Sequence, residues 1–260
     1  MRHMLFPTRL HRMHRTQKRA TAITPTNVSG LALWLDLTDT TKLFQDTSAA
    51  TPVAANNDPI GRINDKSSNA NNFTQGTAGR RPLWQSDGNG GLFDGTDDVL
   101  AGSTTGLLIT SKTIIVAWTP VTFPSSTRVV FGASSTNYYY VGHTGSTADM
   151  RASWFNSTSN QKGQASGAVW TANKHGIFIT QFDVSGSSVT TYQRGNNGQN
   201  IVRTAYTDGY ATPNPPAFFI GALTSAGGNG VNAKIRHVLV YSRVLTPLEL
   251  AGLETYLTPP

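Results

Sequence analysis

The sequence predicts an all-β antiparallel fold, a sandwich or a barrel, with an extended arm at its start and one short helix at its end. Charged residues make up only 13% of the chain, against about 25% in an average soluble protein, and Gly, Pro, Ser, Thr and Asn fill the difference. Short apolar stretches recur along the chain with turn residues between them, as in sheets of short strands. The third observation is a single helix signal near the C-terminus.

The strand signals follow one another at short intervals. Residues 31–39 (LALWLDLTD) alternate apolar and polar side chains, as a half-buried strand does. A loop over 45–60 and an Asn- and Ser-rich stretch over 61–75 come next, and residues 80–102 contain a Gly-Asn-Gly-Gly turn before an apolar strand. Further strands are expected at 112–121, 128–134, 137–143, 151–157, 175–184, 188–195, 216–223 and 233–243.

The helix is expected over residues 245–257 (LTPLELAGLETYL). Thr246 stands at the N-cap position, Pro247 opens the helix, and Glu249 takes the position that completes a capping box. We expect one face of this helix to be buried through Leu250, Leu253 and Leu257.

Positive charge gathers in the first 20 residues. The formal net charge is +7, and this segment holds 6 of the 21 basic residues and no acid, which leaves 15 basic and 14 acidic residues elsewhere. A nearly neutral body argues against nucleic acid as a partner. We therefore divide the chain into a basic anchoring arm with its linker (1–26) and one folded domain (27–260).

The arm mixes cationic with apolar side chains, which suits a groove on another protein better than a phosphate backbone. The alternatives are contact with packaged nucleic acid, or a leader without a role. The residues expected to anchor the arm are Arg2, Phe6, Arg9, Arg12, Arg15, Lys18 and Arg19.

Composition excludes several kinds of site. The chain has no cysteine, which excludes disulfides, thiolate metal sites and cysteine nucleophiles. No apolar run approaches the ~18 residues of a membrane span, so no membrane insertion is expected. The sequence shows no phosphate-binding glycine loop and no nucleophile–base arrangement, and we expect no cofactor.

Five segments follow one another in a recognisable order: LALWLDLTDTTKLF, DPIGRINDKSSNANNFTQ, RRPLW, LFDGTDDVL and AKIRHVLVYSRVLTPLELAGLETYL. Over roughly residues 28–258 the chain resembles the concanavalin A-like, laminin G type of jelly roll, which is common in bacterial and phage proteins. The resemblance implies a two-sheet antiparallel jelly-roll sandwich. Members of this family bind glycans, contact proteins or serve as passive domains of large assemblies, so the fold leaves the function open.

The resemblance also assigns structural roles to several residues. Trp34 is expected in the sandwich core, and Asp65 and Asn69 are expected to bond turn amides, as such residues do. Tyr241 and Arg243 are expected to hold the terminal helix against the sheet.

Glycoside hydrolysis is not expected, although several enzymes share this sandwich. The reaction needs a positioned acid and a partner carboxylate. The chain holds only two glutamates, Glu249 and Glu254, both in the expected helix, and it lacks the Glu-x-Asp-x-x-Glu strand motif of the jelly-roll glucanases. We therefore expect a protein that is not an enzyme.

Asp94, Asp97 and Asp98 form the densest acidic group of the sequence. Calcium takes carboxylate and carbonyl oxygens, and Gly95 would let the loop curl around an ion. We favour the alternative, in which these residues cap a turn and face water. They are weak calcium candidates, and no other metal site is expected.

Aromatic and amide side chains suggest a glycan-binding platform. Tyr138 and Tyr140 share one face of the expected strand 137–143, and Trp154 and Asn156 lie on the next expected strand. If these strands pair, Tyr140 and Trp154 line a shallow exposed surface. The ordinary alternative is that the rings belong to the core of the sandwich.

The function predicted from these features is that of a bacteriophage virion structural protein, a capsid decoration, head-fibre or tail-appendage module. Its arm would attach to capsid, portal or tail subunits, and multiple copies are expected in the virion because such sites are symmetric. The body would reinforce the particle or contact host surface glycans. The alternative is a free-standing bacterial lectin module.

Overall fold

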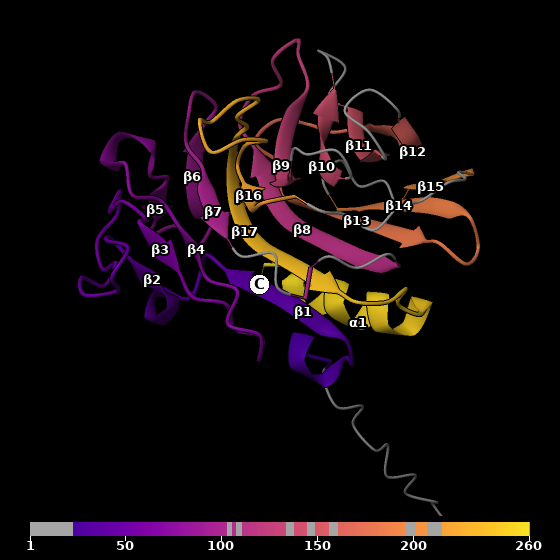
Figure 1. Cartoon of the computed structure of the whole chain (residues 1–260), viewed down its shortest axis with the longest axis horizontal. Coiled ribbons are helices and arrows are strands. Elements are labelled where there is room, and N and C mark those ends of the chain that lie inside the picture. The colour runs from indigo at the N-terminus through magenta and orange to yellow at the C-terminus, as the bar shows by residue number, and fades with distance from the viewer. Residues whose placement is uncertain are drawn as a thin grey trace, which may run out of the picture.

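The computed structural model consists of two antiparallel sheets packed face to face, with one helix outside them (Figure 1). It describes residues 23–102, 106–107, 111–133, 138–144, 149–155, 161–195, 201–206 and 215–259. This architecture confirms the predicted jelly-roll sandwich with its C-terminal helix. The anchoring residues of the arm lie outside the described residues, and the division into arm and body stays a prediction.

The first sheet has eight strands within the described part of the chain. Its order is β15–β14–β13–β8–β17–β6–β5, and β1 pairs with β17 beside this path. Its strands are β1 Leu31–Asp36, β5 Leu83–Gln85, β6 Gly90–Asp94, β8 Lys112–Pro120, β13 Gly176–Asp183, β14 Ser188–Arg194, β15 Ile201–Tyr206 and β17 Asn232–Tyr241.

The second sheet has nine strands over the same described ranges, in the order β12–β11–β10–β9–β16–β7–β4–β3–β2. They are β2 Leu43–Phe44, β3 Arg62–Ile63, β4 Phe73–Thr74, β7 Leu100–Gly102, β9 Arg128–Gly132, β10 Tyr138–Thr144, β11 Asp149–Phe155, β12 Gln161–Val169 and β16 Phe218–Ile220. Short 3-10 helices lie at η1 Pro25–Asn27, η2 Thr40–Lys42 and η3 Ala78–Arg80. Strands β12 and β15 lie outside all the strands expected from the sequence.

The main core lies between the two sheets and is rich in aromatic rings. Trp118 of β8 packs on Trp170 with ring centroids 5.4 Å apart, and Phe131 of β9 stacks on Phe218 of β16 at 5.7 Å. All four rings are buried. Rings of this size account for much of the apolar surface that folding removes from water.

Helix α1 (Pro247–Leu257) covers the outer face of the first sheet (Figure 1). The Thr246 hydroxyl accepts a hydrogen bond from the Glu249 N–H at 3.3 Å, and the Glu249 carboxylate accepts one from the Thr246 N–H at 2.9 Å. The predicted capping box is therefore confirmed. Among the described residues, none of the helices has both the length and the apolar character of a membrane-spanning segment.

A second, smaller core lies between α1 and the sheet. The apolar residues that form it include Trp34, Ile115, Ile177, Leu239, Leu250, Leu253 and Leu257. Trp34 therefore packs under the helix and not in the sandwich core as expected, because its side chain lies on the outer face of β1. Tyr241 is buried in this second core with the leucines of the helix, and its hydroxyl donates a hydrogen bond to the Pro25 carbonyl at 3.1 Å. Arg243 pairs with Glu249 of the helix. The predicted roles of Tyr241 and Arg243 are confirmed.

The predicted turn residues also have structural partners. The Asp65 carboxylate accepts hydrogen bonds from the backbone N–H groups of Trp34 at 2.9 Å, Ser67 at 2.8 Å and Asn71 at 2.9 Å. Asn69 differs from the expectation, because its amide donates to the Ala32 carbonyl of β1 at 3.0 Å and bonds no turn amide within the described residues. Both residues fix the loop after β3 to β1.

Candidate functional site

The predicted platform of Tyr140 and Trp154 is wrong. Strands β10 and β11 pair as expected, but Trp154 lies opposite Tyr139, and Tyr140 lies opposite Ser153. Residues directly opposite share a face, so Trp154 joins Tyr139 in the core, where it is fully buried and lies 5.2 Å from the Phe182 ring. Tyr140, on the other face, is only 6% exposed.

The remaining two residues of that proposal are not placed. Tyr138 belongs to β10, but its side chain is not among the described groups, and Asn156 lies outside the described residues. The ordinary alternative, burial of aromatic rings in the sandwich, therefore holds for both rings that the structure describes.

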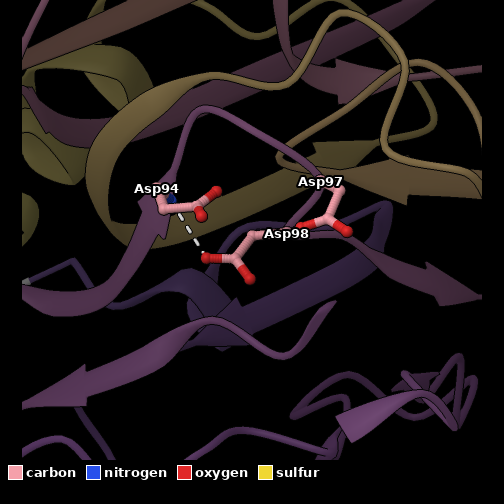
Figure 2. Close-up of side chains that lie close together, drawn as sticks. All are labelled: Asp94, Asp97 and Asp98. Carbon is pink, nitrogen blue, oxygen red and sulfur yellow. Dashed lines mark hydrogen bonds between the residues drawn. The ribbon is translucent and has the colours of Figure 1, made fainter. Parts of the chain in front are cut away.

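The acidic group surrounds the turn between β6 and β7 (Figure 2). One carboxylate oxygen from each of Asp94, Asp97 and Asp98 lies within 4.8 Å of the other two. The Asp98 carboxylate accepts a hydrogen bond from the Asp94 N–H at 2.9 Å, drawn as the dashed line in Figure 2, and Asp94 accepts one from the Thr96 N–H at 2.7 Å. The Arg80 Nε atom lies 3.4 Å from a carboxylate oxygen of Asp97 and forms an ion pair with it.

Burial of the Asp98 carboxyl, with the nearby charges of Asp94 and Asp97, raises its pKa to about 6. The hydrogen bonds within the turn agree with the capping role that we favoured, but Asp98 does not face water as expected, because its side chain is buried. The three carboxylates also offer the oxygen ligands that calcium prefers, and calcium binding stays a prediction.

A polar groove lies on the outer face of the first sheet, beside α1. Its smaller cavity has a volume of about 250 Å³ and is lined by Asn89, Thr119, Val121, Asn173, His175 and Lys234. Its larger cavity has about 440 Å³ and is lined by His175, Ile177, Arg194, Gly195, Ala251, Glu254, Thr255 and Thr258. His175 lines both cavities, and we call the two together the His175 groove.

Strand pairing brings these residues together from distant parts of the sequence. Ile177 of β13 lies opposite Arg194 of β14, and Thr119 of β8 lies opposite Lys234 of β17. His175 directly precedes β13 and lines the larger cavity together with Ile177. The result is a row of polar side chains across four neighbouring strands at one end of the sheet.

A β-bulge in β17 adds a further cation beside this row. The register of β17 against β8 shifts between Ile235 and His237, so Arg236 is the extra residue. Bulges re-aim side chains, and they occur often beside functional sites. Arg236 donates a hydrogen bond to the Gly88 carbonyl, and its Nε atom is buried without a hydrogen-bond partner in the described part of the chain.

The electrostatics of the groove leave its centre neutral. Burial, together with the nearby Arg236 and His237, lowers the pKa of His175 to about 4, so its ring is uncharged at neutral pH. The Lys234 Nζ atom lies 2.7 Å from a carboxylate oxygen of Asp87, and the Arg194 Nε atom lies 3.0 Å from a carboxylate oxygen of Glu254, so each forms an ion pair. The charges at both ends of the groove are thus largely balanced.

Several polar atoms of the groove lack protein partners. Both ring nitrogens of His175 and the Thr119 hydroxyl are buried with no hydrogen bond to any described residue. A neutral imidazole has one donor and one acceptor, and buried polar atoms normally have partners. This arrangement suits a neutral ligand that carries hydroxyl groups.

Sequence reasoning missed this groove. Its residues lie on β8, β13, β14, β17 and α1 and in the loops next to these strands and β6, and no motif joins them. The one local signal is Asn173, which adopts a left-handed backbone (φ 59°) in the turn before β13, but such a turn residue has an ordinary structural role.

Solved structures share the fold of this chain at low sequence identity. The binding domain of botulinum neurotoxin serotype C1 matches with a TM-score of 0.56 and 10% identity, over 91% of this chain and 53% of that one. Trypanosoma rangeli sialidase in complex with 2,3-difluorosialic acid matches with a TM-score of 0.54 and 13% identity, over 86% of this chain and 32% of that one. At these identities the likeness shows the fold alone.

A third match is the CBM40 of Ruminococcus gnavus IT-sialidase bound to α2,3-sialyllactose, with a TM-score of 0.47 and 12% identity, over 56% of this chain and 83% of that one. Comparison with the curated proteins finds no match. The sequence model of the concanavalin A-like lectin/glucanases superfamily matches residues 93–251, more than half of the chain. With its two-sheet lectin-like jelly roll, the chain belongs to this superfamily.

Proposed function

We propose that this protein is a carbohydrate-binding lectin module, which holds a glycan in the His175 groove and does not cleave it. The observation that carries the proposal is the groove itself, in which neutral polar atoms lack partners beside open cavities. The binding domain of botulinum neurotoxin DC, which has a similar fold (TM-score 0.54, 11% identity), has been solved in complex with SialylT.

The groove offers the chemistry that sugar hydroxyls need. His175 lines both cavities, and its two buried ring nitrogens have no partner among the described residues, so a small shift of the ring on ligand entry would let them exchange hydrogen bonds with a ligand hydroxyl. The Asn173 side-chain amide, exposed and without a partner in the described ranges, adds a donor and an acceptor. Each hydrogen bond formed by a previously unsatisfied buried group contributes about 1 kcal/mol or more.

The carboxylates of the groove support binding over hydrolysis. Glycosidases place two carboxylic groups on either side of the bond that they break. Among the lining residues that the structure describes, Glu254 carries the single carboxylate, and it pairs with Arg194. The other glutamate, Glu249, caps the helix and pairs with Arg243.

Replacement of His175 by phenylalanine tests the proposal. The variant keeps a ring of similar shape and removes both nitrogens, so we expect glycan affinity to fall roughly tenfold or more while stability stays unchanged or rises. Asn173→Gly removes the amide and keeps the left-handed backbone. A glycan array identifies the ligand, and titration calorimetry measures its affinity for each variant.

Leu248→Ser serves as the control, because Leu248 is 76% exposed on α1 and lines neither cavity. An array without any binder would show that the lectin function is wrong. Binding that is unchanged in both groove variants would place the glycan elsewhere on the protein.

We further propose that the module is carried on a phage particle, held there by its N-terminal segment. The observation in favour is the segregation of charge, since residues 1–20 hold six basic side chains and no acid. Deletion of residues 1–20 is expected to release the protein from particles and to leave its body folded. Co-sedimentation with particles measures the release, and particles that keep the truncated protein contradict the proposal.

A further inference from the structure

The larger cavity of the His175 groove has polar chemistry of its own. Thr255 and Thr258 line it from α1, and the ion pair between Arg194 and Glu254 forms part of its wall. The two charged side chains are 21% and 22% exposed, so they are accessible to a ligand from the cavity.

The ion pair leaves hydrogen-bonding capacity unused. Arg194 donates from Nε to one Glu254 oxygen and from Nη1 to the Gln193 carbonyl. The second oxygen of Glu254 has no hydrogen bond to the described residues. Hydrogen bonds to charged groups are about twice as strong as neutral ones, so a ligand hydroxyl that donates to this oxygen would gain more than one that bonds to a neutral group.

The two cavities adjoin at His175 and differ in size. Pockets for ligands of drug size have volumes of about 300–1,000 Å³. The larger cavity, at about 440 Å³, lies within this range by itself, whereas the smaller cavity, at about 250 Å³, lies below it and reaches such a volume only together with its neighbour. His175 is their common wall, and its ring has one nitrogen to donate and one to accept.

We propose that the groove binds a chain of at least two linked sugar residues, one in each cavity, with the linkage over His175. This inference rests on the proposed lectin function and adds the length of the ligand. The smaller cavity holds one unit through neutral groups, and the larger cavity holds the next through the Arg194–Glu254 pair and the hydroxyls of α1.

The experiment compares monosaccharides with disaccharides on the full chain by titration calorimetry. The probes are glucose and maltose, galactose and lactose, and N-acetylglucosamine and chitobiose. In a series that binds, the disaccharide is expected to bind about tenfold more tightly than the monosaccharide, since the second unit adds hydrogen bonds to a charged pair.

A second arm blocks the larger cavity. Thr255 is exposed on α1, so Thr255→Trp fills the cavity from the helix surface, and the disaccharide affinity is expected to fall to the level that the wild-type protein shows for the monosaccharide. Leu248→Trp on the same helix is the matched control. Should Thr255→Trp unfold, Glu254→Gln removes the ion pair with little change of shape and is expected to lower disaccharide affinity about tenfold.

Equal affinity for both lengths, or a disaccharide advantage that survives Thr255→Trp and Glu254→Gln, overturns the inference and leaves the lectin function standing. Absence of binding in all three series overturns the inference too. A glycan array without any binder overturns the proposed function itself.

Discussion

Replacement of Lys112 by methionine is expected to stabilise the folded protein by about 1–3 kcal/mol at pH 7, because it removes a buried polar group that lacks a partner. Lys112 opens β8 and points into the main core, where it is completely buried. Its Nζ atom has no hydrogen-bond partner among the described residues. Methionine has a similar length and fills the same space with apolar atoms.

Aromatic rings surround the amine. Its Nζ atom lies 3.8 Å from the centre of the Trp154 ring, 4.1 Å from that of Tyr139 and 5.7 Å from that of Phe182. Such contacts favour the charged form, but they replace only part of the hydration that burial removes. Burial therefore lowers the pKa of Lys112 well below its ordinary value of 10.5.

The sign of the pH dependence follows from this lowered pKa. Between the folded-state pKa and about 10.4, the unfolded chain binds a proton at this lysine that the folded chain does not. Wild-type stability therefore rises with pH through this window, by up to ~1.4 kcal/mol per pH unit. The advantage of Lys112→Met is expected to be largest near neutral pH and to shrink towards pH 10.

Urea unfolding at a series of pH values measures both effects. Lys42→Met, at a half-buried lysine of η2, is the control that removes the same charge outside the core. A less stable Lys112→Met protein, or an advantage that does not change with pH, would mean that the folded core solvates this amine.

The fold was largely predictable because its signals are local. The helix has its capping box within four residues, and most strands are apolar runs bounded by turn residues. Strand β12 (QKGQASGAV) shows the limit. It is rich in Gly, Gln, Ser and Ala, which have low strand propensity, so its partner strand and not its own sequence accounts for its conformation. Strand β15 (IVRTAY) differs, because its β-branched and aromatic residues favour a strand although none was expected there.

The candidate site was not predictable, because register and pairing decide it. A shift of one residue between β10 and β11 moves a side chain from surface to core, and sequence cannot fix that register. This is why Trp154 is buried beside Tyr139. In the groove, the pairing of Thr119 with Lys234 joins residues more than a hundred positions apart, and the bulge at Arg236 has no sequence signal.

Replacement of Lys66 by methionine is expected to destabilise the protein by about 2–3 kcal/mol at pH 7, because it breaks a partly buried ion pair whose cost lies between those of exposed and fully buried pairs. The Lys66 Nζ atom lies 2.9 Å from Asp36, 2.8 Å from Asp39 and 4.3 Å from the centre of the Trp34 ring. The Asp36 side chain is 6% exposed. Without Lys66 the Asp36 charge keeps, among the described residues, the Thr38 hydroxyl, the Thr38 N–H and His237 as partners.

The pKa values of this cluster show how strongly its members depend on one another. Burial opposes the charge on Asp36, but His237, Thr38 and Lys66 together outweigh it and lower the pKa of this carboxyl. Burial lowers the pKa of His237 to about 4, although Asp36 acts in the opposite direction. At neutral pH Lys66 is therefore the main cation of the cluster, and His237 does not replace it.

The lowered pKa values of Asp36 and Asp39 also fix the response to acid. The two ionised carboxylates stabilise the folded protein fully above their ordinary pKa of 3.8. This stabilisation is lost as the pH falls through their lower pKa values in the folded state. Lys66→Met removes most of this stabilisation. The difference in unfolding free energy between the variant and the wild-type protein is therefore expected to shrink as acid protonates the carboxyls. The double variant Asp36→Asn/Lys66→Met tests the cause, since it removes the stranded charge and is expected to recover part of the loss.

Thermal and urea unfolding of Asp36→Asn, Lys66→Met and the double variant, compared with the wild-type protein, form a complete double-mutant cycle. Lys42→Met is the control. A coupling energy near zero between positions 36 and 66 would show that water solvates Asp36 in the folded state.

The cluster around Lys66 also affects the groove. His237 of the cluster is next in the chain to Arg236, and both residues lower the pKa of His175. Loss of Lys66 is therefore expected to weaken glycan binding as well, which titration calorimetry on the folded fraction measures.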